Sequence, residues 1–447
     1  MALRRSLTLS ALTMIAIGST IGSGIFRTPG RIAEAVHLPE YVILIWVLGG
    51  LAALAGALTY AEMGSMYPKA GGLYVYLREA YGDTVGFLYG WYILFISTSG
   101  SIAAVAVVCA EHLLLLFGID GGGAWVVPLA ALITIGLTIV NLFGVNVGGW
   151  MAQLFTSAKL LGLAVLILAG LAWALPEVAA ANRESVFANT PPVYLWSAIG
   201  TAFVGVLWSY GGWQHASFMA GETRDPQRTV PLAMILGASV VTLMYVLANV
   251  SYMRLLPVEQ IAQSKTVAAD ALGMLSPWGR KFMALVIALS TFGTTAIYCM
   301  TAPRIYYAMA ADGLFFQKLA RVHPRWQTPV NAMLIQGVWS VVLLLFWGTF
   351  ESLIDYVTFM DWIGLALAGA AIFVFRRRLP DVPRGYRTWG YPVTPLVFIG
   401  IATWFVTATL VEKPGKALAG FAVVLVGWAA YYWLFRPGKA TAPDAER

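Results

Sequence analysis

Charged residues are scarce in this sequence. They make up 11% of its 447 residues, whereas 59% of the residues are hydrophobic and the mean hydropathy is +0.75. Soluble globular domains carry about 25% charged residues, so this chain has too few to cover a surface that faces water. The composition excludes a soluble globular protein and predicts an all-α polytopic membrane protein.

Cysteine and histidine are also rare, with two and four residues respectively. Cys109 and Cys299 both lie in apolar runs far apart in the chain, which excludes a disulfide framework and a four-ligand zinc site. The sequence also lacks the HExxH and GxSxG patterns of metalloproteases and hydrolases. We therefore expect no enzymatic activity, no cofactor and no metal.

The net charge of +7 is not concentrated in a basic face that could follow nucleic acid phosphates. Lys and Arg lie instead in short connections between apolar runs, seventeen on one side of the predicted bundle and seven on the other. Cytoplasmic loops carry the excess of basic residues in membrane proteins. We expect a plasma (inner) membrane protein with both termini cytoplasmic, and no nucleic acid partner.

Twelve apolar runs are long enough to span a bilayer, which takes about 20 helical residues. These runs cover approximately residues 9–35, 41–66, 84–117, 124–142, 150–174, 193–219, 230–252, 281–310, 330–348, 354–375, 392–411 and 417–435.

Two of the twelve runs, the first and the sixth, combine closely spaced glycines with serines near their middle. The first run contains IGSTIGSGIF at residues 17–26, and the sixth contains WSYGGW at residues 208–213. A glycine inside a helix costs about 1 kcal/mol relative to alanine. Interrupted segments at corresponding positions of two halves of a chain point to a transporter site.

Unwinding within a bilayer is tolerated only where other groups satisfy the exposed backbone. Free N–H groups at the start of a half-helix attract a carboxylate, and free carbonyls at the end of the other half accept bonds from an ammonium. A free amino acid carries both groups on one carbon, so the paired interruptions predict an amino acid site. The alternative is that these glycines only permit close helix packing.

Five segments in order resemble the amino acid–polyamine–organocation superfamily, and within it the bacterial members of the L-type amino acid transporter branch. Besides the two interruptions they are YAEMGSMYPKAGGLYVYLREAYG (60–82), ETRDPQRTVP (222–231) and RGYRTWGYPVTPLVF (384–398). The resemblance implies a LeuT-like fold of two inverted five-helix repeats plus two further helices, with helices 1 and 6 unwound at mid-membrane.

The resemblance also implies a domain organisation. The transporter core would cover residues 1–376, with repeats at about 9–174 and 193–376. Helices 11 and 12 would occupy residues 377–435, and residues 436–447 would form a cytoplasmic tail.

The same resemblance assigns the substrate site. The N–H groups of Ser23 and Gly24 would bind the carboxylate, and backbone carbonyls in both interruptions would bind the ammonium. Trp208 stands where this branch often has phenylalanine, which leaves the size of the side-chain pocket open. The predicted substrate-binding residues are Thr20, Ile21, Gly22, Ser23, Gly24, Trp208, Tyr210, Gly211 and Gly212.

Lys159 lies deep in the fifth run, and an ionisable residue within a membrane span is a functional candidate. The resemblance implies that its ammonium replaces the sodium ion of related folds. It would then contact carbonyls near Gly18 and hydroxyls such as Ser290 or Thr291. The alternative is a lysine that reaches the interface along its own side chain.

Neither interruption contains an acidic residue, so an additional positive charge on the substrate would be unpaired and costly to bury. We therefore predict a sodium-independent exchanger of neutral L-amino acids. A proton-coupled symporter and a cationic amino acid or polyamine carrier remain alternatives, and a nutrient sensor or a channel would belong to other classes. The sequence gives no role to Asp361 or His215.

Mammalian L-type carriers bond to a partner subunit through a cysteine in the external loop after the third span. The corresponding segment here, GIDGGGA at residues 118–124, contains no cysteine. We therefore expect no disulfide-linked heavy subunit. The expected partners are the amino acid substrate and the lipid bilayer.

Overall fold

The computed structural model describes residues 3–119, 123–173, 175–184, 195–347, 350–412 and 414–435. Within these ranges the chain is helical and contains no β-strand, as predicted. The helices are α1 (Leu9–Thr20), α2 (Gly24–Val36), α3 (Pro39–Met66), α4 (Leu73–Tyr81), α5 (Asp83–Tyr92), α6 (Thr98–Leu116), α7 (Val126–Leu142), α8 (Val145–Ala172), α9 (Pro176–Glu184), α10 (Leu195–Tyr210), α11 (His215–Phe218), α12 (Pro226–Leu255), α13 (Val258–Gln263), α14 (Val267–Leu275), α15 (Pro277–Thr301), α16 (Pro303–Ala311), α17 (Val330–Trp347), α18 (Phe350–Arg378), α19 (Val393–Glu412) and α20 (Pro414–Ala430).

Nine helical segments of the described residues are long and apolar enough to cross a membrane. Two further apolar helices, Val330–Phe346 and Gly420–Phe435, are shorter, and the sixth predicted run begins before residue 195, outside the described residues. The fold is thus that of a polytopic helical protein, whereas the count of twelve spans and the inverted repeat stay predictions. The predicted tail at 436–447 lies outside the described residues.

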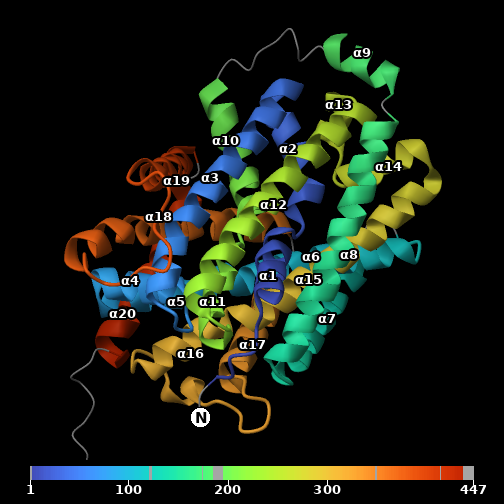
Figure 1. Cartoon of the computed structure of the whole chain (residues 1–447). Helices are drawn as coiled ribbons and strands as arrows, with labels where there is room; N and C mark the ends of the chain where they lie inside the picture. Colours follow the sequence, from blue (N-terminus) through green and yellow to red (C-terminus); the bar gives the residue numbers. More distant parts are fainter. Residues whose placement is uncertain are drawn as a thin grey trace, which may run out of the picture.

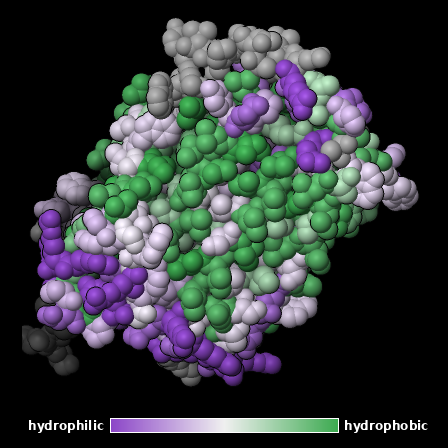
Figure 2. Space-filling view, turned by 45° about the horizontal axis from the view of Figure 1, so that its top comes forward, coloured by the Kyte–Doolittle hydropathy of each residue, from purple (hydrophilic) through white to green (hydrophobic). Residues whose placement is uncertain are grey.

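A broad hydrophobic band crosses the visible face of the molecule, and hydrophilic residues gather toward its two ends (Figure 2). Helices α7 and α8 expose large apolar side chains such as Leu132, Ile139, Leu161 and Leu168. A soluble protein rarely exposes so many apolar side chains together. This surface suits contact with lipid.

Helix α1 lies in the interior, where it packs against α8, α12 and α15. Figure 1 shows α1 and α2 near the centre of the molecule, with α7 and α8 on one side and α18, α19 and α20 on the other. All residues from Ile15 to Ile25 are buried. The interior also holds charged groups, since Lys159, Glu222 and Arg304 are fully buried.

The segment before α1 pairs with the segment after α11. The N–H groups of Ser6 and Leu7 donate to the carbonyl of Glu222 at 2.9 and 3.0 Å, and the N–H of Arg224 donates to the carbonyl of Leu7 at 2.9 Å. An isolated bridge between Leu7 and Thr223 is part of this contact. The two segments are therefore joined by backbone bonds at this end of the molecule.

Candidate functional site

The first predicted interruption is present between α1 and α2. Helix α1 ends at Thr20 and α2 begins at Gly24. The N–H of Gly22 bonds to the carbonyl of Thr20 at 2.9 Å, a tight turn in place of the helical bond. The interruption frees backbone groups on both sides of residues 21–23.

The second predicted interruption is present between α10 and α11. Helix α10 ends at Tyr210 and α11 begins at His215. Gly212 adopts a φ of +132°, a conformation that residues with a Cβ rarely adopt. Its N–H bonds to Oε1 of Gln214 at 2.9 Å, so a side chain partly replaces the lost helical bonding.

The two interruptions touch each other directly. The hydroxyl of Ser19 donates to the carbonyl of Gly212 at 2.9 Å. A Cβ added to Gly212 would lie 2.5 Å from the carbonyl oxygen of Ser19 and 2.7 Å from the N of Thr20. Glycine is therefore required here both by its backbone angle and by the approach of another main chain.

Helix α12 links the same two places through one side chain. The hydroxyl of Tyr245 lies 2.9 Å from the carbonyl oxygen of Thr20 and 3.1 Å from that of Ser209. Tyr245 is fully buried. Two interruptions that are 190 residues apart in sequence thus share one hydrogen-bonding group.

The ammonium of Lys159 bonds to carbonyl groups at the C-terminal end of α1. Its Nζ donates to the carbonyls of Gly18 and Ile21 at 2.9 and 2.7 Å and to Oγ1 of Thr294 at 2.9 Å. The three donors of the ammonium are all used. The predicted contact with the carbonyl of Gly18 is confirmed.

The predicted hydroxyl partners of Lys159 need correction. Thr294 holds the ammonium, whereas Thr291 bonds to carbonyls of its own helix, those of Ile287 and Ala288. Ser290 reaches the same carbonyl as Lys159, that of Ile21, at 3.1 Å. Residues 290 and 294 share one face of α15 because they are four apart, whereas the hydroxyl of Thr291 is occupied within α15.

The carbonyls predicted to bind an ammonium already accept hydrogen bonds. That of Ile21 accepts bonds from Lys159, Ser290 and Thr294, and that of Thr20 accepts one from Tyr245. A carbonyl has two lone pairs. Ile21 therefore serves Lys159, so the assignment of its carbonyl to a substrate ammonium is not supported by this structure.

The other side of the first interruption carries unused donors. Ser23 is 1% exposed, and its hydroxyl has no hydrogen-bond partner among the described residues. No hydrogen bond in the described ranges uses the N–H of Ser23 or Gly24. These groups lie at the start of α2, where backbone N–H groups and the helix dipole favour an anion.

A small cavity of about 40 Å³ lies beside the second interruption. This volume admits a few water molecules and is too small for an amino acid. Three of the predicted substrate-binding residues, Trp208, Gly211 and Gly212, line it. None of the predicted residues from Thr20 to Gly24 is among its lining in the described part of the chain.

Tyr210 does not face this cavity. Its hydroxyl donates to the carbonyl of Trp46 at 2.9 Å, and its ring packs against those of Trp46 and Tyr245. Tyr210 follows Trp208 by two residues, about 200° around the helix, so the two rings point in different directions. Of the two residues, only Trp208 lines this cavity, and contact of Tyr210 with a substrate stays a prediction.

Two residues without a predicted role do line the cavity. The carboxylate of Asp361 in α18 accepts bonds from Tyr92 and Ser97 at 2.8 and 2.6 Å. His215 lies 2.6 Å from the hydroxyl of Thr301 through Nδ1, and its ring stacks on that of Tyr298. The sequence marked Asp361 only as an acid within an apolar run.

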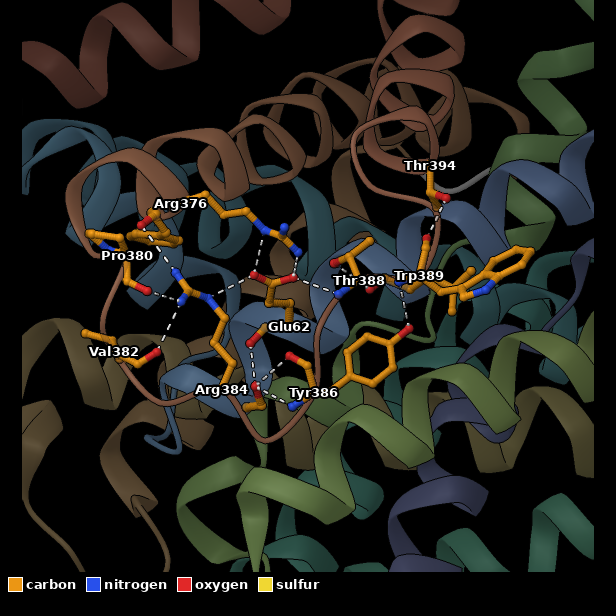
Figure 3. Close-up of polar contacts among 12 residues, drawn as sticks. Glu62, Arg376, Pro380, Val382, Arg384, Tyr386, Thr388, Trp389 and Thr394 are labelled. Atoms are coloured by element: carbon orange, nitrogen blue, oxygen red, sulfur yellow. Dashed lines mark hydrogen bonds and ion pairs between the residues drawn. The ribbon is translucent and has the colours of Figure 1, made fainter.

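Buried ion pairs outside the cavity have structural partners. Figure 3 shows Glu62 between Arg376 and Arg384, with N–O distances of 2.7 and 3.0 Å, and accepting the N–H of Thr388 at 2.7 Å. This cluster joins α3 to α18 and to the segment before α19. A second pair, between Arg304 and Glu222, is fully buried at 2.6 Å.

Possible metal ligands are dispersed over the described residues, where no three His, Cys, Asp or Glu side chains form a group that could hold a metal ion. The two cysteines are buried and unpaired with one another.

Comparison with known proteins assigns the family. Residues 7–434 match the family described as Amino acid permease. The chain is 30% identical over 440 residues to the human b(0,+)-type amino acid transporter 1, covering 97% of this chain and 88% of that protein. It is also 30% identical over 428 residues to the serine/threonine exchanger SteT of Bacillus subtilis, covering 95% of each chain.

A third relative, the human large neutral amino acids transporter small subunit 2, is 29% identical over 457 residues, which cover 98% of this chain and 82% of that protein. The matches confirm the resemblance based on the five sequence segments. Together with the apolar helices and the paired interruptions, they show that the chain belongs to the amino acid permease family of the amino acid–polyamine–organocation superfamily and is a multi-pass membrane transporter of amino acids, not an enzyme.

Proposed function

We propose that this protein is a sodium-independent exchanger of neutral L-amino acids that works by alternating access. The observation that carries the proposal is the direct contact between two interrupted helices beside a small cavity. Relatives that are named as a serine/threonine exchanger and a large neutral amino acids transporter support exchange and neutral substrates. We assign the chain twelve spans, with two inverted five-helix repeats.

In this proposal the substrate carboxylate binds the N–H groups of Ser23 and Gly24 and the hydroxyl of Ser23. All of these are without a partner in the described part of the chain. The ammonium binds backbone carbonyls at the end of α10, near Trp208 and Gly211, two residues that line the cavity. The carbonyl of Trp208 also accepts the N–H of Gly211 at 3.2 Å. The cavity must enlarge before a substrate enters, because its present volume of about 40 Å³ is too small.

Sodium independence rests on Lys159. Its ammonium donates to the carbonyl of Gly18 in α1, to the carbonyl of the C-cap residue Ile21 and to the hydroxyl of Thr294 in α15. These are oxygen ligands of the kind that a sodium ion would use. A fixed positive charge at this place repels a second cation. A transporter with this arrangement therefore binds substrate without sodium.

A proton-coupled symporter is the second candidate function, and burial of Lys159 favours it. The partners of its ammonium are uncharged oxygens, so release and rebinding of a proton at Lys159 during the cycle would couple transport to pH. Exchange and symport differ in one respect that is easy to measure. Exchange needs an amino acid on the far side of the membrane, and symport does not.

We further propose that the protein lies in the inner membrane with both termini in the cytoplasm. It would then act without a disulfide-linked heavy subunit, because the described part of the loop after α6 has no cysteine.

Uptake into proteoliposomes tests the proposal. Purified protein is reconstituted into liposomes that are either empty or loaded with an unlabelled neutral amino acid in excess over the external labelled one. Uptake of labelled L-serine and L-leucine is then followed at several pH values in sodium or choline buffer. We expect uptake to rise at least roughly tenfold with internal amino acid, which corresponds to about 1.4 kcal/mol in the effective barrier. Replacing sodium by choline should leave the rate unchanged.

Two results would contradict exchange without sodium. Equal uptake into empty and loaded liposomes, driven by an inward proton gradient, would favour the symporter. Uptake that depends steeply on sodium at constant ionic strength would refute the role given to Lys159. Recovery of labelled substrate inside the vesicles distinguishes a carrier from a sensor that binds without transport.

A further inference from the structure

Only one of the two oxygens of the Asp361 carboxylate accepts hydrogen bonds in the described part of the chain. Both of its recorded hydrogen bonds, from Tyr92 and Ser97, go to the same oxygen, Oδ1. Oδ2 has no hydrogen bond in the described part of the chain. The side chain lines the cavity that Trp208 and Gly211 also line, so an acceptor oxygen is available to whatever enters this space.

The cavity offers no cation to balance this carboxylate. Among the described residues that line it there is no Lys or Arg, and the single histidine, His215, contacts the hydroxyl of Thr301 through Nδ1. The buried cations described above have other partners: Lys159 bonds to α1 carbonyls and Arg304 to Glu222. A carboxylate buried without a counter-charge is expensive, and a positively charged ligand would relieve that cost.

Aromatic rings surround the same space. The electron-rich faces of such rings attract ammonium and guanidinium groups. The aromatic residues that line the cavity are Tyr89, Trp208, Phe218, Tyr298 and Trp362. Carboxylate and rings together favour a cation over an uncharged apolar group.

The backbone near Asp361 is specialised as well. Helices α5 and α6 are joined by a π-helical turn at Ile93–Ser97, and Ser97 at its end donates to Asp361 at 2.6 Å. Single π turns inside α-helices occur frequently at functional sites. α18 packs against this turn and against α10, so the carboxylate is positioned by three elements that meet at the cavity.

We propose that Asp361 forms a side-chain subsite for a positive charge, so that the carrier accepts basic amino acids such as arginine and lysine in addition to neutral ones. This inference rests on the proposed amino acid site at the interruptions. In it the α-carboxylate and α-ammonium of the substrate bind backbone groups, and the terminal guanidinium or ammonium binds Oδ2 of Asp361. The absence of acidic residues from the interruptions favoured neutral substrates over cationic ones, and the cavity supplies an acidic residue from α18.

Competition between matched pairs of amino acids tests this subsite. Uptake of labelled L-serine into loaded proteoliposomes is measured against increasing arginine or citrulline, which have nearly the same shape and differ in charge. Lysine and norleucine form a second pair. Wild-type protein should be inhibited by arginine at a concentration at least roughly 30-fold lower than by citrulline, as expected for a buried charge pair.

The variant Asp361→Asn keeps the shape and removes the charge. It should lose the preference for arginine, so that arginine and citrulline inhibit serine uptake at concentrations within about threefold of each other. Asp381→Asn, at an exposed position before α19, is the matched control and should behave as wild type. If Asp361→Asn does not fold, Asp361→Glu provides a second test, because it keeps the charge and should retain the preference.

The outcomes separate this inference from the proposed function. Equal inhibition by arginine and citrulline in the wild type would overturn the subsite and leave the neutral exchanger intact. An unchanged arginine preference in Asp361→Asn would also overturn it, as would a change only in the pH dependence of serine uptake. Absence of serine uptake in the wild type would instead count against the proposed function.

Discussion

Both interrupted helices contain closely spaced glycines, but the backbone groups at the two interruptions have different surroundings. Between α1 and α2, the carbonyls of Gly18 and Ile21 are bonded to Lys159 and to hydroxyls of α15. Between α10 and α11, Trp208 and Gly211 border a cavity that contains no such cation in the described residues. The first interruption is bonded to side chains of α8 and α15, and the second borders a small cavity.

The difference shows that a glycine-rich interruption does not by itself identify a binding site. What matters is whether other protein groups already satisfy the free backbone groups. At the first interruption only the donors near Ser23 are unpartnered among the described residues. We therefore expect the carbonyl side of this interruption to determine conformation and its N–H side to contact the substrate.

We expect the largest effect from removing the ammonium of Lys159, which bonds to carbonyls at the first interruption. Lys159→Met removes the ammonium and keeps most of the side-chain volume. Because charge-assisted hydrogen bonds contribute about 1.5–3 kcal/mol each, we expect uptake to fall by at least roughly 100-fold. The rate of L-serine exchange in proteoliposomes measures this effect.

Lys281→Met is the control for this variant, since Lys281 is exposed near the start of α15. Size-exclusion chromatography shows whether the variants remain folded. Uptake by folded Lys159→Met within threefold of wild type would mean that the first interruption does not need its internal cation.

We expect an intermediate effect on exchange from substitutions at the glycines of the two interruptions, which form two pairs. A Cβ on Gly24 would lie 2.8 Å from Cα of Ser209, and one on Gly212 would meet Ser19 and Thr20. Gly22 and Gly211 have room, with nearest atoms at 3.5 and 3.4 Å. We therefore expect Gly24→Ala and Gly212→Ala to reduce exchange by at least roughly tenfold, a change of about 1.4 kcal/mol.

The paired variants Gly22→Ala and Gly211→Ala should retain exchange within about threefold and serve as matched controls. Thermal unfolding in detergent, followed for all four variants, shows whether the loss comes from stability. Equal behaviour of the four variants would contradict the view that close approach of the two main chains is what requires glycine.

The smallest effect concerns the donor side of the first interruption. Ser23→Ala removes a buried hydroxyl that has no partner among the described residues. The midpoint of thermal unfolding should stay the same or rise slightly, because no protein hydrogen bond is lost. The KM for exchange should rise by roughly five- to tenfold, since a hydrogen bond to the substrate carboxylate contributes about 1 to 1.4 kcal/mol. A lower unfolding midpoint with unchanged KM would indicate a structural role instead.

Local sequence signals predicted the interruptions well. Glycines and hydroxyls within an apolar run conflict with helix propensity, and the structure interrupts both helices there. The contact of Lys159 with the carbonyl of Gly18 was likewise predictable, through the family resemblance, for a cation deep in an apolar run. These features depend on residues within one helix or on a pattern that the family shares.

Features that depend on helix rotation were not predictable. The choice of Thr294 over Thr291 depends on how α15 is turned toward α1. The direction of Tyr210 depends on the packing of Trp46 from α3. Asp361 reaches the cavity because α18 packs against α6 and α10, and no local pattern in the α18 sequence specifies those neighbours.

The backbone pairing of Leu7 with Glu222 and Arg224 affects how the molecule can move. It fastens the chain just before α1 to the chain just after α11, so the near halves of the two interrupted helices are linked at both of their ends. If the protein opens at the end where Leu7 pairs with Glu222, we expect α1 and α11 to move together as one rigid unit. A covalent crosslink between these segments should therefore leave turnover intact, whereas a crosslink from either of them to α8 should stop it.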